Sequence, residues 1–563
     1  MDLQRIFLFL IFAFSLMMIW DGWQRHTNPI IQQSISSDVS KPHTQSLDSP
    51  SSSVSKTSPV PDLPATIKNS GQSVTIQQKI QQATGKSIHV KTDFFEAEIN
   101  TIGGDITRLS LLKHSDGQDK NKSLVLFQRG NGTHNYIAQS GLLGADVPNH
   151  NSLYVSEKDQ YEISGNAEFV QVRLNSESDS KLKVSKVITF HKGSYLIDVA
   201  YELENSGLQA VSASSYYQVV RDSVAPAGGS RFLPTYTGAA VYTDKSKFKK
   251  IEFADIEKGK IDYPKQADDG WIGILQHYFV VAWLPKEKTS REYFTRKLDG
   301  DSYAVGLVLP SLVIEPGQKA FVSSSLYAGP TESSLDKIAP GLGLTVDYGW
   351  LTIIATPLFW VMTLFNSWTH NWGIAIILLT VLIKLIFFPL SAASYRSMAK
   401  MRLVAPKLEK IKQQHSDDRE QLNRAMMELY KTEKINPLGG CLPVLVQIPV
   451  FIALYWAILS SVEMRNAPFF GWITDLSAAD PYYVLPLIMG ASMIVQMSLN
   501  PKPPDPLQAK VMQIMPIAFS VIFFFFPAGL VLYSIVNNLL SIAQQWVITR
   551  NAEKESKGVV PKR

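Results

Sequence analysis

Five long apolar runs in the C-terminal part of the chain constrain its fold more than any other feature. They cover residues 372–394, 442–462, 483–499, 507–526 and 528–548. A helix of about 20 apolar residues crosses the hydrocarbon core of a bilayer and bonds its own backbone groups there. The runs therefore predict a membrane protein with an all-α, five-helix transmembrane core over 372–549.

A further apolar run, Ile6–Trp20, follows Arg5 at the N-terminus. Residues 21–30 lack the small residues that a cleavable signal peptide needs, so we expect an uncleaved transmembrane anchor helix over 1–26. Residues 27–87 are rich in Ser, Thr, Gln and Pro and bury too little apolar surface to fold. This segment is predicted to be a disordered tether.

The hydrophobic pattern changes to period two between residues 88 and 330. Before the turn at 205–207, the alternating apolar residues are Tyr195, Ile197, Val199, Tyr201 and Leu203. Similar runs occur at 184–190, 278–284, 303–309 and 321–327, with turn signals at Gly103-Gly104 and Gly228-Gly229. Such alternation of apolar and polar residues is typical of strands with one buried face. The segment predicts a large antiparallel β-sandwich, and we find no catalytic motif in it.

Residues 331–371 join the predicted β-sandwich to the helical core. Asp347–Trp368 mixes aromatic, aliphatic and polar positions and contains Pro357. Aromatic residues favour the headgroup boundary of a membrane. We therefore expect a linker followed by an interfacial amphipathic helix.

Loop charge predicts how the helices are oriented. The segment 396–440 contains Arg396, Lys400, Arg402, Lys407, Lys410, Lys412, Arg419, Arg424, Lys431 and Lys434. The loop over 464–482 contains only Arg465. Cytoplasmic loops carry the excess of Lys and Arg. The basic loop, the basic tail over 550–563 and both termini are therefore predicted to be cytoplasmic, and the β-domain periplasmic.

Several functional classes find no support in the composition. The formal net charge is only +5, which makes no strong case for nucleic-acid binding. Cys441 is the single cysteine, so an internal disulfide and a multi-thiolate metal site are excluded. The ten His residues form no HExxH pair or comparable motif. We expect no metal and no cofactor.

Lys384 lies within residues 374–388, which are otherwise almost wholly apolar. Twelve residues separate it from Arg396, which is about 18 Å along a helix, and a lysine side chain reaches roughly a third of that distance. Snorkelling to the interface is therefore inadequate. The pattern favours a lysine that faces the bundle interior and a hydrated cavity.

Other polar residues in the apolar runs could line the same cavity. They are Thr380, Gln447, Ser534, Asn537, Asn538, Gln544 and Gln545. Each of them could equally act as an interhelical hydrogen-bonding residue. No run holds an acidic partner for Lys384, because Glu463 and Asp475 lie at the expected periplasmic edge. The positive charge would be available to an acidic residue of a visiting polypeptide.

The basic loop has an amphipathic pattern of its own. Its apolar positions include Met398, Met401, Met426 and Met427, and the pattern breaks around 415–418. A helical hairpin over 396–436 is predicted. Methionine-rich faces adapt to varied partners. The hairpin either receives nascent segments or is a plain solvated hairpin.

Five segments of the C-terminal half resemble the signature segments of YidC-type membrane protein insertases. They are Tyr395–Met401, Met426–Lys431, Asn436–Pro443, Asp480–Pro486 and Phe526–Tyr533. With the anchor, tether and β-sandwich before them, nearly the whole chain is similar to the Gram-negative version of this family.

The resemblance implies a bacterial inner-membrane protein whose five helices enclose a hydrophilic groove. The groove charge in the family is typically Arg, and Lys384 stands at that position here. Lysine keeps the charge and loses the planar fork of donors. Tyr533 matches a family aromatic, and Ser534 stands where a second aromatic often follows it.

The resemblance also implies a function and its partners. The chain would insert and help fold inner-membrane proteins, alone or with the SecYEG translocon, and would contact nascent membrane proteins, ribosomes and membrane lipids. Two alternatives come from other classes. One is a secondary transporter or channel. The other is an intramembrane hydrolase with Ser534 or Ser391 as nucleophile and Lys384 as base.

Overall fold

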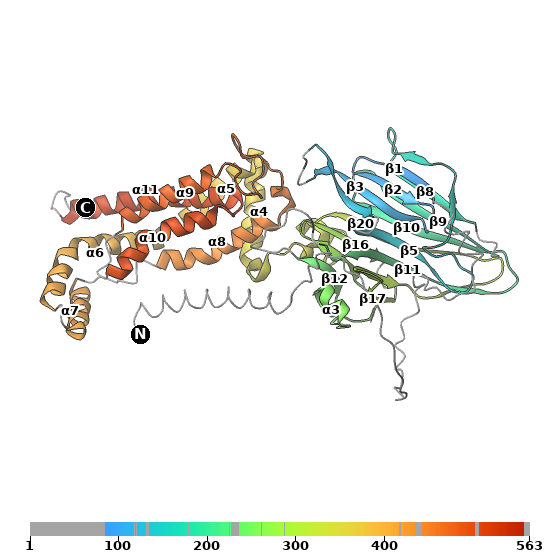
Figure 1. The fold of residues 1–563 in the computed structure, drawn as a ribbon, viewed down its shortest axis with the longest axis horizontal. Coiled ribbons are helices and arrows are strands. Elements are labelled where there is room, and N and C mark those ends of the chain that lie inside the picture. The colour runs from blue at the N-terminus through green and yellow to red at the C-terminus, as the bar shows by residue number, and fades with distance from the viewer. Residues whose placement is uncertain are drawn as a thin grey trace, which may run out of the picture. The chain divides into compact units, whose positions relative to one another are not determined.

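The computed structural model describes residues 85–556 with short gaps (Figure 1). The gaps are 117–118, 120, 131–133, 178–180, 225, 227–235, 261, 287, 416–417, 434–441 and 501–505. The expected anchor over 1–26, the tether up to residue 84, the Gly228-Gly229 turn and the end of the tail over 557–563 lie outside the described residues. The predictions for them are not tested here.

Two sheets form the β-domain. The larger sheet contains, in spatial order, β14 (Gln266–Ala267), β17 (Arg291–Lys297), β18 (Ser302–Val308), β11 (Val211–Asp222), β5 (Asn135–Leu143), β4 (Ser123–Arg129), β3 (Asp105–Ser115), β2 (Phe95–Asn100), β1 (Ser87–Lys91) and β7 (Gln160–Glu162), with β19 (Leu312–Ile314) paired to β11. The second contains β13 (Lys247–Ile251), β12 (Thr237–Thr243), β15 (Trp271–Gln276), β16 (Phe279–Pro285), β20 (Lys319–Pro330), β10 (Leu196–Asn205), β9 (Leu182–His191), β8 (Phe169–Ser176) and β6 (Tyr154–Ser156). A short helix, α3 (Phe253–Glu257), follows β13.

The period-two pattern of the sequence places one face of strands such as β10 in the core, whereas β16 and β18, which were expected to have one buried face, are buried on both faces. In β10, Ile197, Val199, Tyr201 and Leu203 are buried at alternate positions, and β10 pairs antiparallel with β9 and β20. Successive side chains of a strand point to opposite faces, so this alternation gives a buried and an outer face. The expected two-sheet sandwich is confirmed.

The sandwich differs from the expected antiparallel pattern at one edge. Strand β7 pairs parallel with β1, and His89 lies opposite Gln160. A parallel pair needs a long connection, and the segment between β1 and β7 includes β2 to β6. Such long-range pairing leaves no local mark in the sequence.

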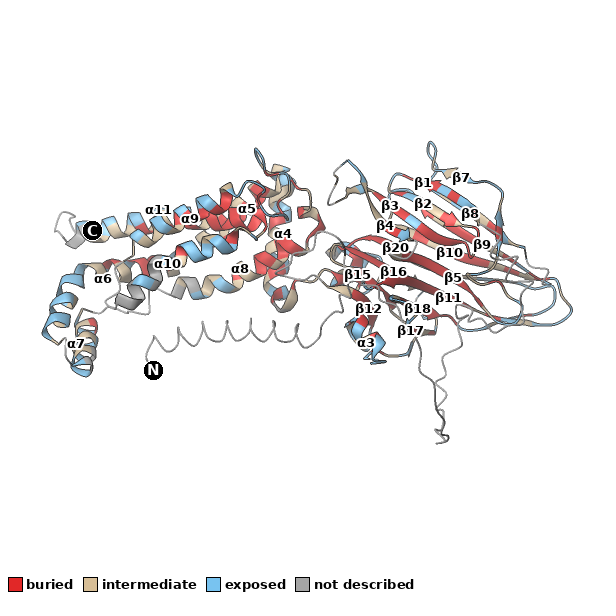
Figure 2. Cartoon of the chain, viewed as in Figure 1, coloured by how far each residue is buried: buried red, intermediate tan, exposed pale blue. Residues whose placement is uncertain are grey.

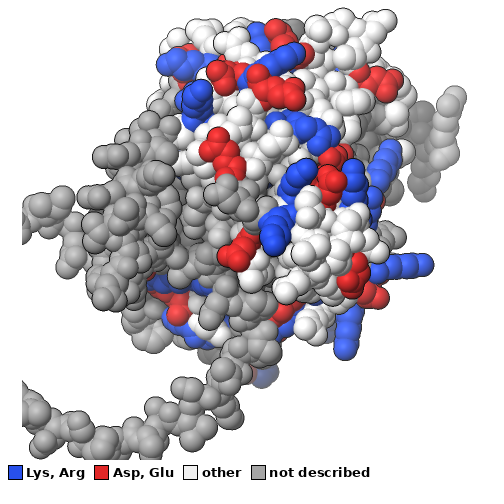
Figure 3. Space-filling view, turned by 90° about the vertical axis from the view of Figure 1, so that its right-hand side faces the viewer, with Lys and Arg blue, Asp and Glu red and all other residues white. Residues whose placement is uncertain are grey.

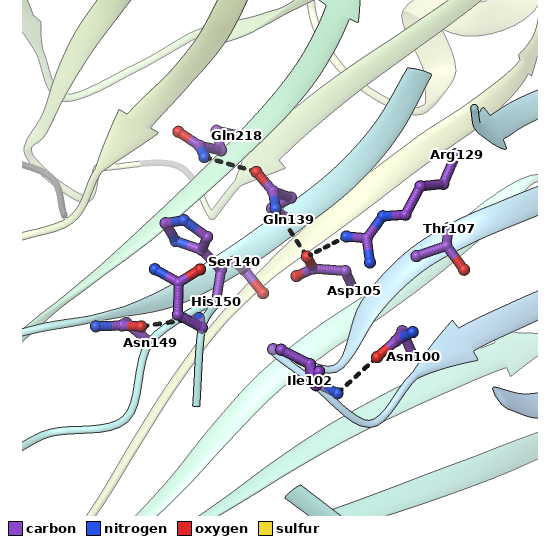
Figure 4. A network of polar contacts seen from close by, with 12 residues as sticks. Asn100, Ile102, Asp105, Thr107, Arg129, Gln139, Ser140, Asn149, His150 and Gln218 are labelled. Carbon is purple, nitrogen blue, oxygen red and sulfur yellow. Dashed lines mark hydrogen bonds and ion pairs between the residues drawn. The ribbon is translucent and has the colours of Figure 1, made fainter. Parts of the chain in front are cut away.

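A buried polar network lies in the β-domain (Figure 4). Asp105, at the start of β3, accepts hydrogen bonds from Gln139 at 2.8 Å and from Arg129 at 3.3 Å. Burial raises the pKa of Asp105 to about 6, against the opposing effects of Lys186, Gln139 and Arg129. Lys186 donates to the Gly103 carbonyl at 2.8 Å, and burial lowers its pKa to about 8.

His150 extends this network toward β11. Its ring hydrogen-bonds the Tyr216 hydroxyl, and burial lowers the pKa of His150 to about 4, with smaller contributions from Lys186 and Arg129. Gly103 approaches the same loop with φ +77°, and a Cβ there would lie 2.3 Å from the His150 carbonyl oxygen. Only glycine satisfies both demands. These groups tie the two sheets together rather than form an open site.

Acidic and basic side chains are intermixed on the face drawn in Figure 3, so neither sign gathers into one patch there. Several pair with each other on the β-domain, including Arg173 with Glu202 and Lys249 with Asp262. Exposed pairs of this kind contribute little stability. The described residues of this face show no concentration of either charge.

Helices dominate the described chain after residue 350. They are α4 (Thr352–Thr369), α5 (Trp372–Ile386), α6 (Phe388–Gln414), α7 (Arg419–Thr432), α8 (Leu442–Ser460), α9 (Val484–Ser498), α10 (Pro506–Phe523) and α11 (Ala528–Ser556). Short 3₁₀ turns occur at Ser333–Lys337, Leu342–Thr345, Gly349–Leu351 and Val462–Met464. The helix expected to interact with the membrane boundary is α4, which buries Phe359 and Met362 and exposes Trp360 and Trp368.

The first apolar run does not continue as one straight helix to residue 394. Helix α5 ends at Ile386, and α6 begins at Phe388 with a bend of 66°. Pro389 stands in the first turn of α6 and has no N–H to bond backward. Helix α6 then continues without interruption into the hairpin and contains Pro406.

Helix α11 is the centre of the helical packing. It contacts α5, α6, α8 and α9, while α4 packs on α5 and α8 and α10 packs on α9. Figure 2 shows the buried residues gathered where these helices meet. Their core includes Leu379 of α5, Ala457 of α8 and Leu530 of α11.

Length and hydropathy alone qualify no single described helix as a membrane span, but the bent pair α5 and α6 qualifies together. Shorter apolar helical segments lie at Leu445–Ser460, Val484–Ser498 and Ile514–Phe523.

Candidate functional site

An open pocket lies where α5, α6 and α8 meet, beside the bend. The pocket is shallow: its 290 Å³ of empty space includes open solvent, and only about 10 Å³ can hold the centre of a water molecule. We call it the Lys384 pocket. Its lining residues are Ile383, Lys384, Phe387, Leu390, Ser391, Pro443, Val446 and Gln447. Lys384, Ser391 and Gln447 are the polar members of an otherwise apolar wall. The bend after Ile386 gives α5 and α6 different directions and so helps to form the hollow.

Lys384 reaches across the pocket wall to α11. Its Nζ donates a hydrogen bond of 2.7 Å to Ser541 Oγ. Among the described residues, no carboxylate forms an ion pair with it. An ammonium has three N–H donors, so the one to Ser541 leaves two unassigned. The pocket therefore presents a positive charge that the described part of the chain does not neutralise.

Gln447 connects the opposite wall to the same helix. Its side-chain amide donates to the Asn537 side-chain oxygen and, at 3.3 Å, to the Tyr533 hydroxyl. Tyr533 and Asn537 are four residues apart in α11 and so lie on one face of the helix, within reach of the same side chain. The structure thus brings together Lys384, Gln447, Tyr533 and Asn537 at the pocket and at the α11 face behind it.

The hydroxyls of Thr380 and Ser534 bond within their own helices. Thr380 donates to the Ile376 carbonyl at 2.7 Å, and Ser534 donates to the Leu530 carbonyl at 2.9 Å. Both side chains are buried, and neither lines the pocket.

Asn538 and Gln545 face α9 instead. Asn538 donates to Ser492 Oγ at 3.2 Å, and Gln545 donates to the Leu499 carbonyl at 3.2 Å. Gln544 donates to the Phe388 carbonyl at 3.4 Å. Successive polar positions of α11 thus point to different neighbours.

The hairpin consists of the outer part of α6 and of α7. Met401 and Met426 pack against its small core of Val404 and Tyr430. Met398 is partly buried, while 54% of Met427 is exposed. Half of the methionine set therefore stabilises the hairpin itself.

Ser541 is the residue that sequence reasoning missed. It is 2% exposed and holds the lysine, yet a serine in an apolar run has no distinctive signal. Its spacing could have revealed it, because Tyr533, Asn537 and Ser541 follow one another at intervals of four. That interval marks one face of a helix.

Two family models match adjoining parts of the chain. The YidC periplasmic domain matches residues 87–361, and the 60Kd inner membrane protein matches residues 364–555. Together they describe an inner-membrane protein with a periplasmic domain. This class agrees with the sandwich and the apolar helices.

Curated relatives then fix the family. A membrane protein insertase YidC of Nitrosospira multiformis is 53% identical over 560 residues, covering 98% of each chain. Another from Aromatoleum aromaticum is 48% identical over 563 residues, covering 100% of each. The chain belongs to the YidC family of membrane protein insertases. This family membership confirms the resemblance and places the chain among insertases rather than enzymes.

A solved structure is also similar. The crystal structure of an active YidC insertase with its first transmembrane domain resolved covers 84% of this chain and 97% of its own. The sequence identity is 19% and the TM-score is 0.38.

Proposed function

We propose that this chain inserts inner-membrane proteins by holding their translocated segment at the Lys384 pocket. The observation that carries the proposal is the ammonium of Lys384 in a pocket with mostly apolar walls and no neutralising carboxylate among the described residues. An acidic residue of the substrate would pair with this charge. The apolar segment beside it would partition into lipid.

No nucleotide is required for this step. Burying the substrate's apolar surface supplies the free energy, at roughly 25 cal/mol per Å² removed from water. The pocket lowers the barrier for the polar tail, because it shortens the dry path that the tail must cross. Lys384 and Ser391 both line the pocket beside the bend between α5 and α6, which supports this path.

The proposed topology is multi-pass with both termini in the cytoplasm. The concentration of Lys and Arg in 396–440 supports a cytoplasmic hairpin. The exposed Met427 and Leu403 offer it an adaptable apolar surface for emerging segments. We further propose the SecYEG translocon and the ribosome as partners, because the family resemblance and the basic hairpin and tail favour them.

Site-specific photo-crosslinking tests the pocket directly. A probe at Gln447 faces the pocket, whereas a probe at Ile448, which is 45% exposed and not part of the lining, is its matched control. During synthesis of a two-span substrate, crosslinks are expected from 447 and few from 448. Equal crosslinking from both positions would refute a specific pocket.

Charge variants test the role of Lys384. Lys384→Arg retains the positive charge and is expected to retain insertion, whereas Lys384→Glu repels an acidic tail and is expected to lose it. Insertion is measured as protease protection of the translocated tail. Normal insertion by Lys384→Glu would refute the proposed mechanism.

A further inference from the structure

Ser541 has no freedom in how it hydrogen-bonds. A serine hydroxyl has one donor and two acceptor lone pairs. Its donor is used at 2.7 Å on the Asn537 carbonyl, one turn back in α11. The oxygen can therefore act only as an acceptor toward other groups, and it lies 2.7 Å from Lys384 Nζ.

Tyr395 of α6 is buried near Ser541. The 2.7 Å contact between Lys384 and Ser541 joins α5 to α11 at one buried oxygen atom.

This arrangement fixes the lysine without neutralising it. A lysine side chain has four methylene groups joined by rotatable bonds. Without a partner, its ammonium would occupy many positions. A carboxylate partner would hold the ammonium but cancel its charge. A neutral, oriented acceptor holds it and leaves its charge available to the pocket.

We propose that Ser541 is a positioning residue that fixes the Lys384 ammonium so that the pocket favours translocated segments carrying a carboxylate. This inference rests on the proposed function. It concerns selectivity for acidic tails over neutral ones of the same size. The Asn537 carbonyl contributes by holding the Ser541 proton away from Lys384.

The test compares two substrates that differ only in a carboxylate or an amide at one position. A two-span protein carries either a single Asp or a single Asn in its translocated tail, and the full-length insertase supports its insertion in cells. The readout is the ratio of Asp-tail to Asn-tail insertion. Losing a hydrogen bond to a charged group is expected to lower this ratio by about threefold to tenfold in Ser541→Ala.

Matched variants separate positioning from structure. Ser541→Thr keeps the acceptor and is expected to restore the ratio, while Ser541→Cys keeps the size with a weak acceptor and should behave like Ser541→Ala. Ser534→Ala is the control, because Ser534 is a buried serine of the same helix that donates to the carbonyl four residues earlier and does not hydrogen-bond Lys384. Its ratio is expected to remain unchanged.

Each other outcome overturns a specific statement. Equal loss for both tails in Ser541→Ala, or failure of Ser541→Thr to rescue, would mean that Ser541 is only structural. Lys384→Gln distinguishes the two proposals. If it abolishes the preference and Ser541→Ala does not, only the positioning role fails; if Lys384→Gln leaves the preference intact, the proposed function fails.

Discussion

The side-chain amide of Gln447 donates to the side-chain oxygen of Asn537, which joins α8 to α11 across 90 positions of sequence. The pocket wall and the central helix are therefore held by a polar contact as well as by packing. In a membrane such contacts are modest, because the separated helices find other partners.

Removing this contact is expected to lower stability slightly. Gln447→Ala should reduce the free energy of unfolding by about 1 kcal/mol, and a double-mutant cycle with Asn537→Ala should give a coupling of about 0.6 kcal/mol. Unfolding of the full-length protein in mixed micelles measures both. Tyr533→Phe, which loses only the 3.3 Å contact, should have a smaller effect. Strictly additive effects would show that the contact contributes nothing.

Arg402 is expected to hold the inner end of the hairpin. Its guanidinium donates to the Leu499 carbonyl at 2.7 Å, and Gln545 donates to the same oxygen. The last carbonyls of a helix otherwise lack partners. Arg402→Ala should accelerate amide hydrogen exchange at the end of α9 and in adjoining α6 by about threefold to tenfold.

Lys407→Ala is the control for Arg402→Ala. Lys407 pairs with Glu433 on the exposed surface of the hairpin, where such pairs contribute little. Its exchange profile should match that of the unmodified protein. A similar acceleration in both variants would point to a general loss of positive charge instead.

Acidification is expected to destabilise the β-domain through His150. Burial lowers the pKa of His150 from 6.5 to about 4, so its stabilising contribution is present above pH 6.5 and is lost as pH falls through about 4. Lowering the pH from 7 to 5 should reduce the free energy of unfolding of the β-domain by about 2 kcal/mol through this group. Hydrogen exchange of β5 and β11 amides in the full-length protein, corrected for intrinsic rates, measures the loss. His150→Gln should flatten that pH dependence, and an unchanged slope would contradict the assignment.

Asp105 is expected to act with the opposite sign. Burial raises its pKa from 3.8 to about 6, so its contribution is present below pH 3.8 and is lost as pH rises through about 6. As the pH rises from 4 to 7.5, the free energy of unfolding of Asp105→Asn should therefore increase by about 2 kcal/mol relative to that of the parent protein. Exchange of β3 amides reports it. A gain that is independent of pH would assign the effect to hydrogen bonding rather than to ionisation.

The sequence predicted the local parts of this fold well. Period-two apolar positions located β10 and its neighbours, and Asn205 forms the expected turn, because its side chain accepts from the Gly207 backbone. Local patterns suffice there, since one buried face requires alternation. The expected hairpin likewise appears as α6 and α7.

Features that depend on distant partners could not be predicted in this way. Pro389 alone does not predict a 66° bend after Ile386, and the parallel β1–β7 pair depends on strands far apart in sequence. Lys384 was conspicuous because charge is rare in an apolar run. Ser541 was not, because its role exists only when α5 lies beside α11.

Helix α6 also has a mechanical consequence. It spans 27 residues, about 40 Å, from Phe388 beside the pocket to Gln414 at the hairpin tip. A uniformly stiff helix of this length would transmit a movement of the hairpin tip to the pocket. Pro406 removes the backbone bond to the Arg402 carbonyl, four residues after the point where Arg402 clamps the inner segment to α9. The missing bond makes α6 easier to bend at Pro406 than elsewhere, beyond the segment that Arg402 holds.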